Sequence, residues 1–195
     1  MRNGTHGIVV LSGFVLVLLL SNCKPQSRVI VPTNMSLTGS DGKNREVAKI
    51  VSQNKLTVFI FDSDGCPTMA AHDERISSWA KRFLDRGVRF YRIESERLER
   101  GVVASKQSRP SHELLTYYAD HSAQLAQLLG IEFATHSVVF DANGEIVYSG
   151  ALDSDRVVLH ADARMYLEET LEDLLANRKP RYGSPEPLGC VLQLH

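Results

Sequence analysis

Cys66 is the residue whose surroundings best suit chemistry. A run rich in apolar residues (55–61) precedes it, the polar turn Asp62-Ser63-Asp64-Gly65 follows that run, and Pro67 comes directly after the cysteine. This order predicts a buried strand, a tight loop and a helix that begins at Cys66, because proline is well tolerated in a first helical turn. A thiol there meets unpaired N–H groups and the positive end of the helix dipole, which both favour thiolate. Thiolate attacks disulfides and peroxides and binds metals, so three chemistries are open.

The N-terminus has the features of a targeting segment. Arg2 supplies positive charge, and residues 7–20 form an apolar stretch that is short for a membrane span. The segment Leu20-Ser21-Asn22-Cys23 resembles the lipobox of bacterial lipoproteins, although Asn22 stands where Gly, Ala or Ser is usual. The resemblance implies that residues 1–22 are a signal peptide and that lipid on Cys23 anchors the protein to a bacterial membrane. We therefore expect a cell-envelope protein on the extracytoplasmic face; the alternative is an ordinary signal peptide with an incidental cysteine.

The chain of 195 residues has three cysteines. If Cys23 carries lipid, Cys66 and Cys190 remain as two thiols outside the cytoplasm, which suits a redox pair or a shared metal site. The alternative is two isolated thiols. We expect a tether over residues 23–36, one folded domain over residues 37–179, and a C-terminal tail over residues 180–195 that carries Cys190. Net charge is −1 with both signs well mixed, so no nucleic-acid partner is expected.

The hydrophobic pattern predicts elements that place Cys66 at the end of a central strand. A strand, a helix and a second strand are followed by a short helix, a hairpin around Asn143-Gly144 and a long final helix. Residues 113–118 fit a helix or a strand. This order predicts an α/β fold with a central mixed sheet flanked by helices. The expected ranges are helix 45–52, strand 56–61, helix 67–86, strand 88–93, helix 122–129, hairpin 137–149 and a helix from 155 or 156 to 177.

The element order resembles the thioredoxin fold over roughly residues 37–177. Within that fold, Asp64-Gly65-Cys66-Pro67 together with residues 148–153 resembles the redoxin group, which is related to the AhpC/TSA peroxidases. The tail segment 187–191 also resembles an ending found in some extracytoplasmic members. The resemblance implies thiol–disulfide or peroxide activity centred on Cys66. We expect extracytoplasmic protein thiols or a redox partner as partners, and no cofactor.

The sequence departs from two relatives of that group. A thioredoxin carries Cys-x-x-Cys, but Met69 stands where the second cysteine belongs, so Cys190 is the candidate resolving thiol if the tail folds back over the helix. A disulfide then needs the two Cα atoms within about 7 Å. A peroxiredoxin needs a hydroxyl residue three positions before its thiolate, which Ser63 supplies, and a proline further back, where Phe59 stands.

His136 marks the third departure. It takes the place of the cis-proline that thioredoxins carry before the hairpin, and residues 133–145 resemble Sco-type copper chaperones. That resemblance implies a copper site with Cys66 and His136 as ligands, and Cys190, His72 or Met69 as candidates to complete it, since thiolate and imidazole suit copper. His136 is alternatively a base for Cys66, a residue that lowers the pKa of its thiol, or a loop histidine without a chemical role. A non-catalytic interaction domain is the third functional alternative.

Overall fold

The apolar run before Cys66 forms the strand β3 (Leu56–Asp62) in the computed structural model, which describes residues 30–31, 34–95 and 114–194. All seven residues of β3 are buried. The strand pairs in parallel with β4 (Val88–Glu94) on one side and antiparallel with β6 (Ser137–Asp141) on the other. A strand covered on both faces needs a continuous apolar sequence, which explains why this segment does not alternate.

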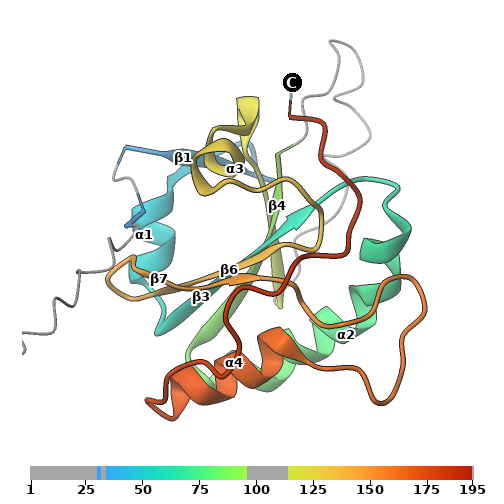
Figure 1. Cartoon of the computed structure of the whole chain (residues 1–195). Coiled ribbons are helices and arrows are strands. Elements are labelled where there is room, and N and C mark those ends of the chain that lie inside the picture. Colours follow the sequence, from blue (N-terminus) through green and yellow to red (C-terminus); the bar gives the residue numbers. More distant parts are fainter. Residues whose placement is uncertain (1–29, 32–33, 96–113, 195) are drawn as a thin grey trace, which may run out of the picture.

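The sheet has seven strands in the order β2-β1-β5-β4-β3-β6-β7 (Figure 1). Three neighbouring strands, β5, β4 and β3, run parallel, and the remaining pairs are antiparallel. The predicted mixed sheet is therefore confirmed. The strands not yet located are β1 (Ser36–Gly39), β2 (Asn44–Glu46), β5 (Leu115–Ala119) and β7 (Ile146–Gly150).

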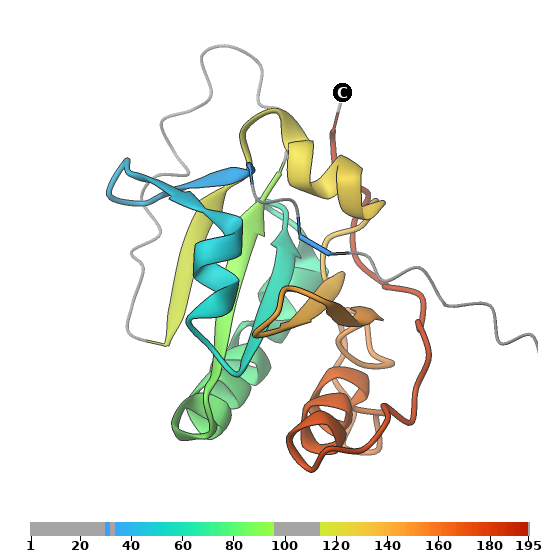
Figure 2. The same cartoon turned by 90° about the vertical axis from the view of Figure 1, so that its left-hand side faces the viewer.

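Helices cover both faces of the sheet. Two helices, α2 (Pro67–Phe83) and α4 (Tyr166–Leu175), lie along one face, and α1 (Val47–Ser52) and α3 (Gln124–Leu129) lie on the other (Figures 1 and 2). Arg86, in the 3-10 turn Leu84–Arg86 after α2, pairs with Glu172 of α4 at 2.8 Å. Gly87 then ends this turn with φ +82°, the left-handed conformation that glycine adopts most easily. The α2 segment, with its following turn, matches the predicted helix 67–86.

The final helix is shorter than the sequence predicts. It begins at Tyr166, whereas the pattern predicted a start at Asp155 or Arg156. Two carboxylates hold the intervening chain in turns: Asp153 Oδ1 accepts the N–H of Asp155 at 2.9 Å, and Asp155 Oδ2 accepts the N–H of His160 at 2.9 Å. Side-chain bonds of this kind compete with the backbone bonds of a helix. The long helix was therefore a wrong prediction.

The N-terminal part of the fold also differs from expectation. β1 and β2 form a hairpin that the sequence pattern did not predict, and the predicted helix 45–52 is shorter in the structure, where it is α1. Val31, within the expected tether 23–36, is buried and donates its N–H to Gly144 O at 3.1 Å. The undecided segment 113–118 contains most of strand β5.

The hairpin between β6 and β7 occurs where the sequence predicts it, with a different turn. Asp141 N–H donates to Glu145 O at 3.0 Å, which leaves a three-residue loop. Gly144 has φ +82°, whereas Asn143 does not have positive φ. The turn is thus the three-residue kind that ends in a left-handed glycine, and not the two-residue Asn-Gly turn.

No helix among the described residues has the length and apolar character to cross a membrane. The predicted signal peptide 1–22 and Cys23 lie outside the described residues.

Candidate redox site

Cys66 stands at the start of α2, as the sequence predicts. It is the N-cap residue of this 17-residue helix, and Pro67 occupies the first helical turn. The N–H of Cys66 donates to Ser63 O at 3.3 Å, and its carbonyl accepts the N–H of Ala70 at 3.0 Å. Gly65 makes the turn before it with φ +73°. The backbone therefore fixes the thiol at the positive end of a long helix, where thiolate is stabilised.

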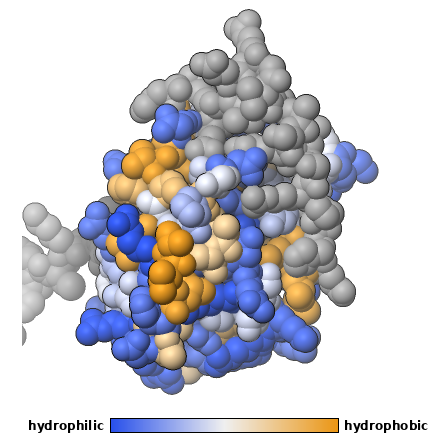
Figure 3. All heavy atoms as spheres, turned by 90° about the vertical axis from the view of Figure 1, so that its right-hand side faces the viewer, coloured by the Kyte–Doolittle hydropathy of each residue, from blue (hydrophilic) through white to orange (hydrophobic). Residues whose placement is uncertain are grey.

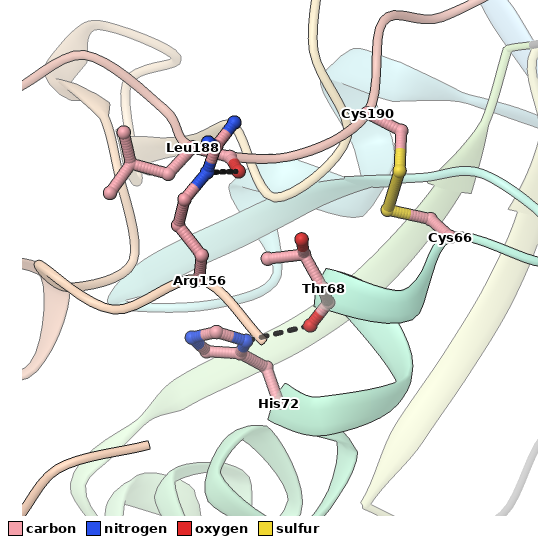
Figure 4. Close-up of a disulfide and its surroundings, with 6 residues drawn as sticks. All are labelled: Cys66, Thr68, His72, Arg156, Leu188 and Cys190. Atoms are coloured by element: carbon pink, nitrogen blue, oxygen red, sulfur yellow. Dashed lines mark hydrogen bonds between the residues drawn. A yellow bond between two sulfur atoms is a disulfide. The ribbon is translucent and has the colours of Figure 1, made fainter. Parts of the chain in front are cut away.

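Cys66 and Cys190 form a disulfide with a Cα–Cα distance of 5.9 Å (Figure 4). This distance lies in the usual range for a bridge. The two cysteines are 124 positions apart in the sequence, so the tail must return across the domain to bring them together. The second thiol that is absent at Met69 is thus supplied by the tail. Met69 itself is buried in the core.

The first half of the tail lies against α4 and the end of β7. Arg181 donates hydrogen bonds to Asp173 of α4, including one at 2.8 Å from Nε, and the pKa of that carboxyl is lowered well below its ordinary range by the bonds from Arg181 and Arg178. Further along, Pro185 O accepts the N–H of Ala151 at 2.9 Å. These contacts bring the chain from α4 to the edge of the sheet (Figures 1 and 2).

The second half of the tail pairs with the loop before β6. The N–H of Ala134 donates to Cys190 O at 2.8 Å, and the N–H of Leu192 donates to Glu132 O at 2.9 Å. These bonds surround an antiparallel bridge between Phe133 and Val191. Leu192 is 5% exposed, so an apolar side chain fixes the tail beyond the cysteine. The tail is held by non-covalent contacts on both sides of Cys190.

Gly189 passes unusually close to the same loop. A Cβ placed on Gly189 would lie 1.9 Å from Ala134 O and 2.9 Å from Thr135 Oγ1. Only glycine fits at this approach. Thr135 has φ +68°, an uncommon conformation for a β-branched residue. The crossing of tail and loop is therefore specified by the residue before Cys190.

Arg156 links the tail to the loop that follows β7. Its Nε donates to Leu188 O at 3.2 Å (Figure 4). The adjacent Val157 and Val158 are 51% and 66% exposed, and Val191 is 61% exposed. The side of the molecule shown in Figure 3 carries apolar groups among hydrophilic ones. Large apolar side chains are thus exposed on the two segments that Arg156 joins.

His136 bonds to the hairpin. Its backbone carbonyl accepts the N–H of Phe61 at 2.9 Å, and its Nε2 is hydrogen-bonded to Ser149 Oγ of β7 at 2.8 Å. Burial lowers the pKa of His136 to about 4, so the imidazole is neutral at pH 7. Within residues 30–31, 34–95 and 114–194 there is no cis peptide bond and no group of three His, Cys, Asp or Glu side chains that could hold a metal. The copper-ligand role of His136 stays a prediction.

His72 belongs to a buried ion-pair network that the sequence pattern does not predict. Its Nδ1 donates to Thr68 O at 2.7 Å, and its Nε2 donates to Asp153 Oδ1 at 3.1 Å. A backbone carbonyl and a carboxylate are both acceptors, so this geometry favours the doubly protonated, cationic imidazole. Burial lowers the pKa of His72, but the hydrogen bonds to Asp153 and Thr68 and the charge of Asp153 together raise it above its ordinary value. Arg75 pairs with Asp153 and, at 3.0 Å, with Asp155.

This network connects α2 to the loop that receives the tail. His72 and Arg75 lie on α2, while the two carboxylates come from the loop after β7, next to Ala151 and Arg156. His72 is only 1% exposed, which is unusual for a charged residue and requires such pairing. The spacing of His72 and Arg75, three residues apart on one helix, was the available sequence signal.

A second buried ion pair joins β4 to the end of β3, next to the Cys66 loop. Arg92 of β4 is 1% exposed and donates to Asp62 at 3.1 Å, at the end of β3, and to Asp73 of α2. The pair ties together the strand and helix on either side of the Cys66 loop. The alternation of β4 gave no sign that Arg92 is buried, because charged residues in strands mostly face solvent.

The comparison with protein families identifies the chain. The model of the Redoxin family matches residues 26–165, which is more than half of the sequence. The chain belongs to the Redoxin family. The match includes β3, Cys66, α2 and the loop that binds the tail, while Cys190 lies beyond its end. No curated protein matches the sequence.

Solved structures show the same fold for this redoxin. An uncharacterized conserved protein from Geobacillus kaustophilus has 21% identity and a TM-score of 0.70, covering 85% of this chain and 90% of that chain. A hypothetical protein from Sinorhizobium meliloti 1021 has 17% identity and a TM-score of 0.69, with 86% and 94% covered. The exposed lipoprotein thioredoxin of Streptococcus pneumoniae has 16% identity and a TM-score of 0.53, with 73% and 98% covered. The predicted thioredoxin-like fold is confirmed.

Proposed function

We propose that this redoxin is a thiol–disulfide oxidoreductase whose redox couple is the Cys66–Cys190 pair. The observation that carries the proposal is the disulfide between a helix N-cap cysteine and a tail cysteine, at a Cα–Cα distance of 5.9 Å. In one turnover the Cys66–Cys190 bond breaks and a bond forms between two thiols of a partner protein. Two electrons and two protons pass from the partner dithiol to the cysteine pair, and the reverse reaction reduces a partner disulfide.

We favour protein thiols over peroxide as the substrate class. Ser63 supplies the hydroxyl of the peroxidase signature, but Phe59 replaces its proline and is a fully buried residue of β3. The tail holds Cys190 beside Cys66, which is the arrangement that exchange with protein thiols requires.

We also propose that the protein is exported and anchored through lipid on Cys23. The signal-like start of the sequence supports this, and the pairing of Cys66 with Cys190 leaves Cys23 as the remaining cysteine. Disulfides persist mainly in oxidising compartments, which agrees with an extracytoplasmic site. The mass of the mature protein, with a lipid-modified cysteine as its first residue, would support the anchor; a mature protein without lipid on Cys23 would contradict it.

The test of the function is an exchange assay on purified protein. The protein should accelerate the reduction of insulin disulfides by dithiothreitol, and Cys66→Ser and Cys190→Ser should each lower that rate at least tenfold. Cys23→Ser is the matched control and should keep the wild-type rate. Full activity in both single variants would contradict the proposal. An inactive wild type with an intact fold would favour a non-catalytic interaction domain.

Copper delivery is the second candidate, because the tail brings two thiols together. In reduced protein these thiolates would suit Cu(I) as cargo. Titration of reduced protein with Cu(I) tests it: binding that is lost in Cys66→Ser and Cys190→Ser supports a two-thiolate site. If His136→Ala also abolishes binding, the predicted Cys66–His136 ligand pair applies. Absence of stoichiometric binding would contradict this candidate.

A further inference from the structure

The two cysteines of the disulfide differ in their access to solvent. Cys66 is 4% exposed and belongs to the buried core, where Met69 is also buried. Cys190 is only partly buried, and Val191 beside it is 61% exposed. The difference follows from the fold, because Cys66 lies between its own helix and the tail that covers it (Figure 4). A thiol arriving from solvent therefore meets Cys190 first.

The two sulfurs also differ as leaving groups. A disulfide breaks faster when the departing sulfur is the more stable thiolate. Cys66 would depart at the N-terminus of the 17-residue helix α2, where N–H groups and the helix dipole stabilise negative charge. Cys190 lies in an extended tail, and its backbone carbonyl is engaged by Ala134. Leaving-group stability and access therefore favour the same direction of attack.

We propose that the partner thiolate attacks the sulfur of Cys190 and releases Cys66, so that the mixed disulfide joins the partner to the tail. This inference rests on the proposed function and names the cysteine that meets the partner. In a thioredoxin-type dithiol the sulfur at the helix start has that role. Here the tail covers the helix start, so Cys190 forms the mixed disulfide with the partner and Cys66 is the leaving group.

The electron balance of the step is complete with a partner dithiol. A bond forms between the partner sulfur and Cys190 Sγ, the Cys66–Cys190 bond breaks, and its electron pair leaves on Cys66 as thiolate. The second partner thiolate then attacks the partner sulfur of the mixed disulfide and displaces Cys190 thiolate. The partner is oxidised to a disulfide, and both cysteines are reduced after proton uptake from the thiols that were consumed.

The site of attack can be read with a small thiol as the probe. Oxidised, folded protein with Cys23→Ser is mixed with 2-mercaptoethanol, quenched with acid after increasing times, and digested at acid pH for peptide mass analysis. Extrapolated to zero time, the adduct should lie on Cys190, with Cys66 free, in at least tenfold excess over the opposite product. Equal adducts, or an excess on Cys66, would overturn the inference and leave the redox couple intact.

The same reaction in guanidinium chloride is the control for the structural cause. Unfolding removes both the burial of Cys66 and the α2 helix, so the preference for Cys190 should fall to less than about threefold. An unchanged preference in denaturant would attribute the effect to local sequence and overturn the inference. If no Cys66–Cys190 disulfide can be formed in folded protein, the proposed function fails together with the inference.

Discussion

The backbone N–H of Ala134 donates a hydrogen bond to the carbonyl oxygen of Cys190 at 2.8 Å. This bond ties the loop before β6 to the residue that bridges to Cys66. The tail therefore depends on main-chain pairing to place its cysteine, in addition to the covalent bond. Because such pairing does not require the disulfide, we expect Cys190 to stay near Cys66 after reduction, which raises the effective concentration of one thiol at the other.

The first prediction concerns Gly189. In Gly189→Ala the new Cβ would lie 1.9 Å from Ala134 O, so the tail must move away from the loop. Overpacking of this kind costs about 1–3 kcal/mol. We expect the equilibrium constant for forming the Cys66–Cys190 bridge, measured in glutathione redox buffers, to fall roughly tenfold, which corresponds to about 1.4 kcal/mol.

Gly183→Ala is the matched control, because nothing lies within 4 Å of a Cβ at that tail position. Its equilibrium constant should stay within twofold of the wild type. A Gly189→Ala variant that also behaves like the wild type would show that the close crossing does not position Cys190.

The Cys66 side of this site could be predicted from sequence, whereas its partner's position could not. The signals around Cys66 are local, and each predicts a backbone conformation: an apolar run for the strand, a polar segment for the turn, and Pro67 for the start of the helix. The return of the tail depends on contacts such as Gly189 with Ala134, which are more than fifty positions apart. The cysteine count and the missing Cys-x-x-Cys motif predicted Cys190 as the partner thiol, but no local pattern gave its position beside Cys66.

The second prediction concerns stability. The disulfide closes a loop with a sequence separation of 124, and bridges over long loops typically stabilise a protein by about 2–4 kcal/mol. Guanidinium unfolding of Cys66→Ser, Cys190→Ser or reduced wild type should therefore give free energies of unfolding lower by about 2–4 kcal/mol. Added reductant should not further destabilise either variant. Equal stability of oxidised and reduced wild type would contradict the expectation.

The third prediction concerns the charge of His72. Because Asp153 raises the pKa of His72 above its ordinary value, the stabilisation is complete below about pH 6.5 and is lost as pH rises through the folded pKa. Nitrogen NMR should find both ring nitrogens protonated at pH 7 in the wild type. Asp153→Asn should lower the pKa of His72 and destabilise the protein. A neutral His72 at pH 6 in the wild type would contradict the assignment.

The fourth prediction concerns His136, whose pKa burial lowers to about 4. Between about pH 6.5 and about pH 4, the unfolded chain binds a proton at His136 and the folded protein does not. The free energy of unfolding therefore falls as the pH is lowered through this interval. His136→Gln should flatten the dependence of unfolding free energy on pH in that interval. A wild-type slope in His136→Gln would count against a buried neutral imidazole.

The segment before α4 shows why sequence pattern misled at one place. The predicted final helix included Val157 and Val158, yet these residues are more than half exposed and lie in a loop. Asp153 and Asp155 decide the local conformation by accepting backbone N–H groups. They also bind His72 and Arg75 of α2, a pairing between distant segments that no local pattern contains. The same loop positions the tail, so the wrongly predicted segment lies next to the functional site.

The most direct test of the central claim is a peptide map of the oxidised protein under non-reducing conditions, repeated after dithiothreitol and after re-oxidation. The account predicts one linked pair of peptides, containing Cys66 and Cys190, that disappears on reduction and returns on oxidation. Cys23 should be absent from any linked pair. Folded protein in which Cys66 and Cys190 remain free thiols after oxidation, or in which either pairs with Cys23 instead, would contradict the account.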